Sequence, residues 1–211
     1  MDLLNDRAEL HELPPRRHVA TLSFPAQLLM RAQDVRMAIF DVDGCLTDGQ
    51  LQISEQGELV KAFHALDGHG LKLLAQGGIH PVIITGRDSA AVRRRCRDLG
   101  LERAQFGVHD KLAAAEKLRA ELGLGWHEIA VIGDDWPDLP LLLRAALACA
   151  PLNAHAEVRA VAHHVTTVSG GHGAAREFCD LLLIATGRYA ALLAAHQQTL
   201  DTTSPPQAAG G

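Results

Sequence analysis

The sequence has few aromatic residues, no closely spaced cysteines and no long apolar run. Phenylalanine, tryptophan and tyrosine make up 4% of the 211 residues, so we expect a core of aliphatic side chains. The four cysteines are scattered without a C-x-x-C pair, which predicts reduced, buried thiols. They are Cys45, Cys96, Cys149 and Cys179. No stretch approaches the ~20 apolar residues that a membrane span requires. These absences favour a globular protein stabilised by aliphatic packing.

Positive charge is also scarce. The formal net charge is −5 with neutral histidines, which argues against a broad basic groove for nucleic acid but allows a small anion to bind locally. The first twenty residues include four acidic side chains and lack the apolar segment of a secretion signal. We therefore expect a cytoplasmic protein that binds neither nucleic acid nor a membrane.

The length and the ends of the chain indicate one folded domain with two appendages. A chain of 211 residues is long enough for one well-packed domain and short for two. Residues 1–34 are expected to form an N-terminal extension, in which 25–34 favours a short helix opened by a proline. Residues 197–211 have the polar composition of a disordered tail. The folded domain is therefore predicted over residues 35–188.

Between the appendages, short apolar runs alternate with helical patterns. Strands are expected at 35–42, 80–85, 104–108, 128–133, 146–150 and 163–167, and helices at 68–76, 88–99, 110–122, 138–145, 153–160 and 174–186. The main strands lack polar alternation, so both faces should be buried, as in a parallel sheet covered by helices. The pattern predicts a doubly wound, mostly parallel α/β fold. Residues 51–54 and 58–63 flank Glu-Gln-Gly and predict a protruding β-hairpin, 50–63.

Two carboxylates follow the first predicted strand. Ligands in doubly wound folds bind beyond the carboxyl ends of the strands, where Asp41 and Asp43 are placed. In an extended chain they face the same side, and they repel each other unless a cation or a shared proton intervenes. Mg²⁺, which prefers oxygen ligands, suits such a pair. Considered alone, D-V-D-G is also compatible with an acidic turn. Asp48 is expected to belong to the turn that leads into the hairpin.

Further polar side chains follow the other strands. The Thr85 hydroxyl and the Gly86 N–H can hold a phosphate before a helix, although a helix-capping threonine is the alternative. Lys111 opens a predicted helix, where a cation opposes the helix dipole and indicates a bound anion, unless the lysine is simply solvated. Asp134 and Asp135 end another strand. Together these groups supply a nucleophile, an acid, a cation and metal ligands, the set used for phosphoryl transfer to aspartate.

Four sequence motifs, in order, resemble those of haloacid-dehalogenase-type phosphatases. They are D-V-D-G-C-L-T-D, I-I-T-G-R, D-K-L and G-D-D. The chain is most similar to the 3-deoxy-D-manno-octulosonate 8-phosphate (KDO 8-phosphate) phosphatases of lipopolysaccharide synthesis. That similarity is supported by E-L-V-K-A-F-H-A-L-D-G-H-G and by S-G-G-H-G-A-A-R-E-F-C-D-L-L-L, and it covers roughly residues 35–188. The resemblance implies a Mg²⁺-dependent phosphatase that releases phosphate from this sugar acid.

The resemblance also implies roles for the carboxylates. Asp41 would attack phosphorus and form an aspartyl-phosphate. Asp43 would protonate the leaving alkoxide and then deprotonate the hydrolytic water. Mg²⁺ would be held by the Asp41 carboxylate, the Asp43 backbone carbonyl and Asp134, with Asp135 completing or orienting the metal shell. The metal would allow an anionic nucleophile to approach an anionic phosphate.

The remaining candidates would bind the substrate. By the same resemblance, Thr85, Gly86 and Lys111 would contact phosphoryl oxygens. Arg87 and Arg176 are candidates for gripping the substrate carboxylate, because a guanidinium can bind a carboxylate through two hydrogen bonds. The chain departs from the family pattern at three histidines, which are His69, His109 and His172.

The spacing of the motifs leaves no room for a cap domain. The stretch between Asp41 and Thr85 is filled by the hairpin, a helix and a strand, and that between Thr85 and Lys111 holds only a helix and a strand. In the similar family, the hairpin of one subunit covers a neighbour's site within a homotetramer. The resemblance implies the same for residues 50–63.

Two other functions remain open from the sequence. A phosphatase for another 2-keto-3-deoxy or acylneuraminate sugar-acid 9-phosphate would use the same groups. A catalytically silent oligomeric scaffold is the non-enzymatic alternative, but such a protein is expected to lose Asp41, Asp43 or Lys111, and all three are present.

Overall fold

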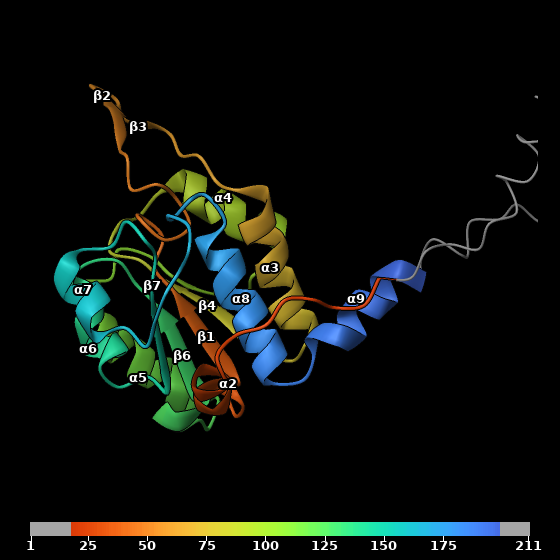
Figure 1. Ribbon diagram of the computed structural model, residues 1–211. Coiled ribbons are helices and arrows are strands. Elements are labelled where there is room, and N and C mark those ends of the chain that lie inside the picture. Colours follow the sequence, from red (N-terminus) through yellow and green to blue (C-terminus); the bar gives the residue numbers. More distant parts are fainter. Residues whose placement is uncertain (1–17, 199–211) are drawn as a thin grey trace, which may run out of the picture.

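The computed structural model describes residues 18–198 (Figure 1). Residues 1–17 of the predicted extension and 199–211 of the predicted tail lie outside the described residues. Within the predicted extension, helix α2 (Ala26–Ala32) follows Pro25, as expected. This helix contacts α8 (Ala174–Ala185) and β7 (Leu147–Ala150), and Ala32 is fully buried. The segment just before the first strand therefore packs on the domain.

Six parallel strands form the central sheet. Their order is β5 (Arg103–Gln105), β4 (His80–Ile84), β1 (Met37–Phe40), β6 (Ile129–Ile132), β7 and β8 (His164–Val165). After β1 the chain adds β4 and β5 on one side. It then crosses to the other side of β1 and adds β6, β7 and β8 in turn. The predicted doubly wound fold is confirmed. Because the winding reverses between β1 and β6, a crevice is expected at their carboxyl ends.

Apolar residues cover both faces of the sheet. Along β1, Ala38 and Phe40 belong to one buried cluster, and Met37 and Ile39 belong to another. The first cluster includes Phe178 of α8, whose ring packs edge-on against Phe40 at 5.4 Å between centroids. Figure 1 shows α3 and α8 on one side of the sheet and α5 and α6 on the other. Burial on both faces explains why these strands lack polar alternation.

The helices follow the predicted alternation with two differences. They are α3 (Ala65–Gln76), α4 (Ala90–Leu99), α5 (Lys111–Glu121), α6 (Leu139–Leu142), α7 (Ala156–Val161), α8 and α9 (Tyr189–Gln198), with short 3₁₀ turns η1 (Trp126–Glu128) and η2 (Trp136–Asp138). The helix predicted at 138–145 is wrong in extent, because the chain must turn into β7, where the Ala146 N–H donates to Ile129. Helix α9 was not predicted; it follows Gly187, which has φ 71°.

The predicted hairpin is present. Strands β2 (Gln52–Ser54) and β3 (Gly57–Val60) pair antiparallel and project from the domain (Figure 1). The second strand is shorter than the predicted 58–63, because the chain leaves the ladder after Val60. No cap domain interrupts the described residues.

None of the helices within residues 18–198 is by itself long and apolar enough to cross a membrane. Helices α8 and α9 reach that length and composition only as a pair, and they are bent by 105°. Most of α8 is buried in the protein core, which accounts for its apolar composition.

Candidate active site

A cavity of about 410 Å³ lies at the carboxyl ends of β1, β4 and β6. Eight of the predicted residues line it, namely Asp41, Asp43, Thr85, Gly86, Arg87, Lys111, Asp134 and Asp135. Val108, His109, Pro137 and Asp138 complete the lining. Residues from four separate motifs are thus brought to one edge of the sheet.

The loop after β1 turns more sharply than an extended strand. The Asp41 N–H still donates to the Ile132 carbonyl of β6 at 3.1 Å, but the N–H groups of Cys45, Leu46 and Thr47 donate back to the Val42 carbonyl. The extended conformation therefore does not continue to Asp43, although both carboxylates line the same cavity. Gly44 has φ 93°, and a Cβ there would lie 2.1 Å from a carboxylate oxygen of Asp134. Only glycine allows this close approach.

Lys111 connects the loop after β1, residues 41–49, to a second carboxylate. Its Nζ lies 2.6 Å from Asp41 Oδ1 and 2.7 Å from Asp138 Oδ1, and all three side chains are buried. Burial alone would lower the pKa of Lys111, but the charges of Asp41 and Asp138 raise it above its ordinary value. The anions that hold this lysine at the start of α5 are carboxylates of the site. Asp110, rather than Lys111, caps the helix, accepting from the Ala113 N–H at 2.9 Å.

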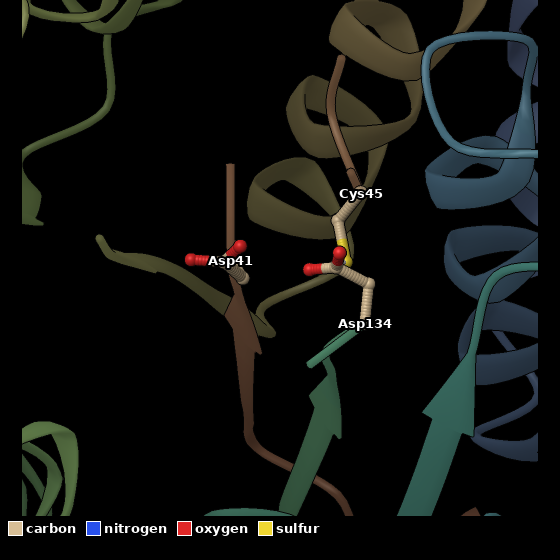
Figure 2. Close-up of side chains that lie close together, drawn as sticks. All are labelled: Asp41, Cys45 and Asp134. Carbon is tan, nitrogen blue, oxygen red and sulfur yellow. The ribbon is translucent and has the colours of Figure 1, made fainter. Parts of the chain in front are cut away.

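Asp41 and Asp134 face each other from the ends of neighbouring strands (Figure 2). Burial, and then the charge of Asp138, raise the pKa of Asp41 to about 6, although Lys111 opposes the shift. Burial and the charges of Asp41 and Asp138 raise the pKa of Asp134 to about 8. Two buried carboxylates that crowd each other in this way favour a divalent cation between them.

The residues present fit Mg²⁺. Ligand atoms of Asp41, Cys45 and Asp134 all lie within 4.8 Å of one another (Figure 2). Burial and the charge of Asp134 raise the pKa of the Cys45 thiol well above its ordinary value, so the sulfur stays protonated. The two carboxylates are the hard oxygen ligands that Mg²⁺ prefers. The Asp41 and Asp134 carboxylates would therefore hold the ion.

The segment after β4 forms the opposite wall of the cavity. Thr85 is buried, and its Oγ1 accepts from the Arg87 N–H at 3.4 Å. The alternative that Thr85 caps the next helix is wrong, because Ser89 is the N-cap of α4 and accepts from the Val92 N–H at 3.3 Å. The Thr85 hydroxyl thus takes no part in the helix cap, and Thr85 and Gly86 line the cavity.

Asp138 is a site residue whose role sequence reasoning missed. Its Oδ2 accepts from the backbone N–H groups of Asp134 at 3.2 Å and Asp135 at 3.4 Å, while its Oδ1 accepts from Lys111. Asp138 therefore holds the loop after β6 and the lysine together. The acidic cluster in G-D-D-W-P-D was visible in the sequence. Its partner Lys111 is supplied by another element, so the role of Asp138 was not visible.

The hairpin contributes two further residues that the sequence did not reveal. Lys61 Nζ forms an ion pair with Asp43 Oδ1 and lies 3.2 Å from Glu58 Oε2. Glu58 Oε1 accepts a hydrogen bond from Ser89 Oγ. Arg87 Nε lies 3.7 Å from Asp43 Oδ2. The E-L-V-K stretch was noted only as part of the family resemblance.

The loop before α8 supports the loop after β1 from outside the cavity. A Cβ at Gly170 would lie 1.8 Å from the Gly44 carbonyl oxygen. Asn153 bridges the two loops, since its Nδ2 donates to Gly44 O at 3.1 Å and its Oδ1 accepts from the Gly170 N–H at 2.6 Å. Asp48 Oδ1 accepts from the Gln50 N–H at 2.9 Å, which confirms its expected place in the turn before the hairpin.

Arg176 is not brought into the cavity within one chain. Its Nε donates to Asp180 Oδ1 at 2.8 Å, and its N–H donates to Asp67 Oδ1 at 2.7 Å. The side chain lines a separate cavity of about 210 Å³ between α3, α8 and α9, together with His69 and His196. Arg87 is therefore the only one of the two predicted carboxylate-binding arginines that lines the candidate site in the described chain.

Comparisons with known proteins identify the family of the chain. The haloacid dehalogenase-like hydrolase family matches residues 107–178. The 3-deoxy-D-manno-octulosonate 8-phosphate phosphatase KdsC of Escherichia coli strain K12 is 38% identical over 163 residues, covering 77% of this chain and 87% of that protein. The corresponding protein of Yersinia pestis is 40% identical over 158 residues, covering 75% and 84%.

A solved structure shows the same architecture. The phosphatase of Moraxella catarrhalis, in complex with magnesium, phosphate and KDO, is 40% identical, with a TM-score of 0.78 over 81% of this chain and 98% of that one. The identity over most of both chains exceeds what a shared fold alone requires. The protein belongs to the haloacid dehalogenase-like hydrolases, in the family of the KDO 8-phosphate phosphatases.

Proposed function

We propose that this protein is a Mg²⁺-dependent phosphatase that hydrolyses KDO 8-phosphate to the free sugar acid and phosphate, in lipopolysaccharide precursor synthesis. The observation that carries this proposal is the buried Asp41–Lys111–Asp138 cluster beside Asp134. In the proposed reaction Asp41 is the nucleophile, Lys111 binds the phosphate and Asp134 binds the metal, and all three side chains line one cavity. Family membership supports the choice of substrate.

The chain's own residues account for two chemical steps. An Asp41 carboxylate oxygen attacks phosphorus, the bond from phosphorus to the sugar oxygen breaks, and Asp43 gives its proton to that oxygen. Water then attacks the aspartyl-phosphate, Asp43 takes a proton from the water, and the Asp41 carboxylate is released with phosphate. When bound, Mg²⁺ screens the negative charges of nucleophile and phosphate.

The remaining groups bind and orient the substrate. Lys111 offsets the charge of Asp41 and binds a phosphoryl oxygen, and Thr85 and Gly86 donate to the others. Asp135 orients the metal shell from the loop that Asp138 holds. Arg87, which is partly exposed at the cavity, binds the sugar-acid carboxylate.

We also infer a homotetramer that works in the cytoplasm. The cavity has no cap, and the hairpin beside it exposes the apolar side chains of Leu51, Ile53, Leu59 and Val60. A second subunit that buries this hairpin would exclude water from the site, which strengthens the electrostatic interactions within it.

A substrate panel tests the proposed reaction. Turnover with Mg²⁺ is measured on KDO 8-phosphate, on acylneuraminate 9-phosphate and on simple alkyl phosphates. The highest kcat/KM is expected for KDO 8-phosphate. Asp41→Asn should abolish turnover on every substrate while leaving the thermal unfolding transition in place. Preference for the 9-phosphate would replace the proposed substrate, and substantial turnover by Asp41→Asn would remove Asp41 as nucleophile.

A further inference from the structure

The base of the hairpin, residues 58–61, places the buried ammonium of Lys61 against Asp43, the carboxylate that exchanges protons in the proposed reaction. Lys61 follows β3, its side chain is 2% exposed, and its Nζ forms an ion pair with Asp43 Oδ1. An ammonium that is removed from water is unfavourable unless acceptors surround it. Here Asp43 and Glu58 supply them. The two ion pairs therefore fix the position of the Lys61 ammonium beside the cavity.

A hydrogen bond to α4 fixes this arrangement. Glu58 Oε1 accepts from the Ser89 hydroxyl, and the same Ser89 Oγ caps α4 by accepting from the Val92 N–H at 3.3 Å. Ser89 is itself buried, so this cap is packed into the domain. The hairpin base is thus attached to the segment that carries Thr85 and Arg87.

The two oxygens of Asp43 have different surroundings. Oδ1 contacts the Lys61 ammonium, whereas Oδ2 has Arg87 Nε at 3.7 Å, beyond hydrogen-bond distance. A carboxylate held at one oxygen keeps the other in a fixed place, free to carry and return a proton. Such fixing matters because proton transfer needs hydrogen-bond contact with the reacting oxygen.

We propose that Lys61 is a positioning residue for Asp43: it holds Oδ1 so that Oδ2 faces the leaving oxygen, with Glu58 and Ser89 keeping Lys61 in place. This inference rests on the proposed function. Lys61 acts through Asp43 and takes no part in the attack on phosphorus. Its loss should therefore slow only those reactions in which the leaving oxygen needs a proton.

Two leaving groups separate this role from a structural one. The alkoxide of a sugar phosphate is a poor leaving group without a proton, whereas p-nitrophenolate leaves as a stable anion. The alkyl phosphate used here is the substrate of the panel with the highest kcat/KM, which we expect to be KDO 8-phosphate. On it, Lys61→Met should lower kcat by about 10- to 100-fold with little change in KM, which is a part of the 10²–10⁴-fold typical of general acid catalysis. On p-nitrophenyl phosphate the loss should stay below about threefold.

Matched variants complete the test. Lys61→Arg keeps the charge and should recover most of the lost kcat. Lys117→Met makes the same change at an exposed lysine of α5 and should match the wild type on both substrates. If Lys61→Met does not fold, Glu58→Gln replaces it; this variant removes one acceptor of Lys61, and a smaller loss confined to the alkyl phosphate is expected.

The outcomes also separate this inference from the proposed function. Equal losses on both substrates, or no loss on either, overturn the positioning role while the phosphatase stands. A wild-type enzyme that hydrolyses neither substrate with Mg²⁺ overturns the proposed function and this inference with it. A loss confined to the alkyl phosphate, recovered by arginine, supports both.

Discussion

At the scale of single residues, the site contains more negative than positive charge. Asp41, Asp134 and Asp138 share one buried ammonium, that of Lys111. Burial, and after it this imbalance, raises the pKa of Asp134 to about 8 and that of Asp41 to about 6. Without a metal, protons bound to these carboxylates reduce the excess of negative charge. With a metal, the protons must leave.

Mg²⁺ binding should therefore release protons. With a pKa of about 8, Asp134 is largely protonated at neutral pH in the metal-free protein, whereas the metal binds the ionised form. The affinity for Mg²⁺ should rise by up to about tenfold per pH unit as the pH increases towards 8, and then level off. Titration calorimetry at pH 7 in two buffers of different ionisation enthalpy measures the protons released.

The exposed turn carboxylate provides the control for this measurement. Asp48→Asn removes an acid of the same loop that does not line the cavity, and it should leave the proton release unchanged. Equal heats in the two buffers would show that Asp134 is already ionised in the metal-free protein, against the prediction.

At the scale of elements, the nucleophile loop, which is the loop after β1 with the proposed nucleophile Asp41, is held from two sides. Lys111 and Asp138 hold Asp41 from inside, and the loop at residues 169–173 presses on Gly44 from outside through Asn153. Such contacts fix a catalytic group without touching substrate. A small displacement of either loop should therefore move Asp41 and lower kcat.

Gly170→Ala should damage both stability and activity. The new Cβ would lie 1.8 Å from the Gly44 carbonyl oxygen and 2.8 Å from that of Thr47, so backbone must move. We expect a loss of about 3 kcal/mol in unfolding free energy, the upper part of the range for overpacking, which corresponds to about 6–12 °C in Tm. Thermal unfolding and kcat measured on the same sample test this.

Gly187→Ala is the comparison for Gly170→Ala. Gly187 has φ 71° but no heavy atom within 4 Å of its would-be Cβ, so only the left-handed backbone is penalised, by about 1 kcal/mol. Its kcat should stay at the wild-type level. If both variants lose the same stability and keep full activity, the two loops are not coupled.

Elements could be predicted where local pattern and tertiary burial agree. The apolar run at 35–42 is buried on both faces and forms β1, and the Asp-Lys junction at 110–111 starts α5. Helix α6 is shorter than its pattern because the chain must enter β7. The Ala-rich segment of α9 was left unassigned, since its residues have no periodic apolar face that marks a core helix.

At the scale of the whole molecule, the parallel sheet collects distant motifs at one edge. This explains why Asp41, Thr85, Lys111 and Asp134 could be assigned to one site from the sequence. The contacts of Lys61 and Asp138 could not be predicted, because they depend on how the hairpin and the loop after β6 fold back on the sheet edge. Arg176, which has a matching motif, faces another cavity for the same reason.

The hairpin provides the prediction at this scale. Ile53 and Leu59 are 58% and 62% exposed in the single chain, and an exposed apolar patch of this kind marks an interface. We expect light scattering with size exclusion to give a tetramer for the wild type and a smaller species for Ile53→Glu. That smaller species should also have lower kcat/KM, because the uncovered site admits water.

An equally exposed residue elsewhere serves as control. Leu143 is 67% exposed at the end of α6, and Leu143→Glu should leave the tetramer intact. A wild-type protein that is monomeric and fully active would contradict the proposed assembly and leave the chemistry of the site unaffected.

The four buried thiols give the molecule internal reporters of its own motions. Cys45 lies in the nucleophile loop, Cys96 in α4, Cys149 in β7 and Cys179 in α8, and all are reduced and buried. An alkylating reagent can reach each sulfur only when its own element opens. The labelling rates of the four cysteines, read by mass spectrometry, would therefore rank how often the loop, an outer helix, the sheet and the core helix open in the unmodified protein.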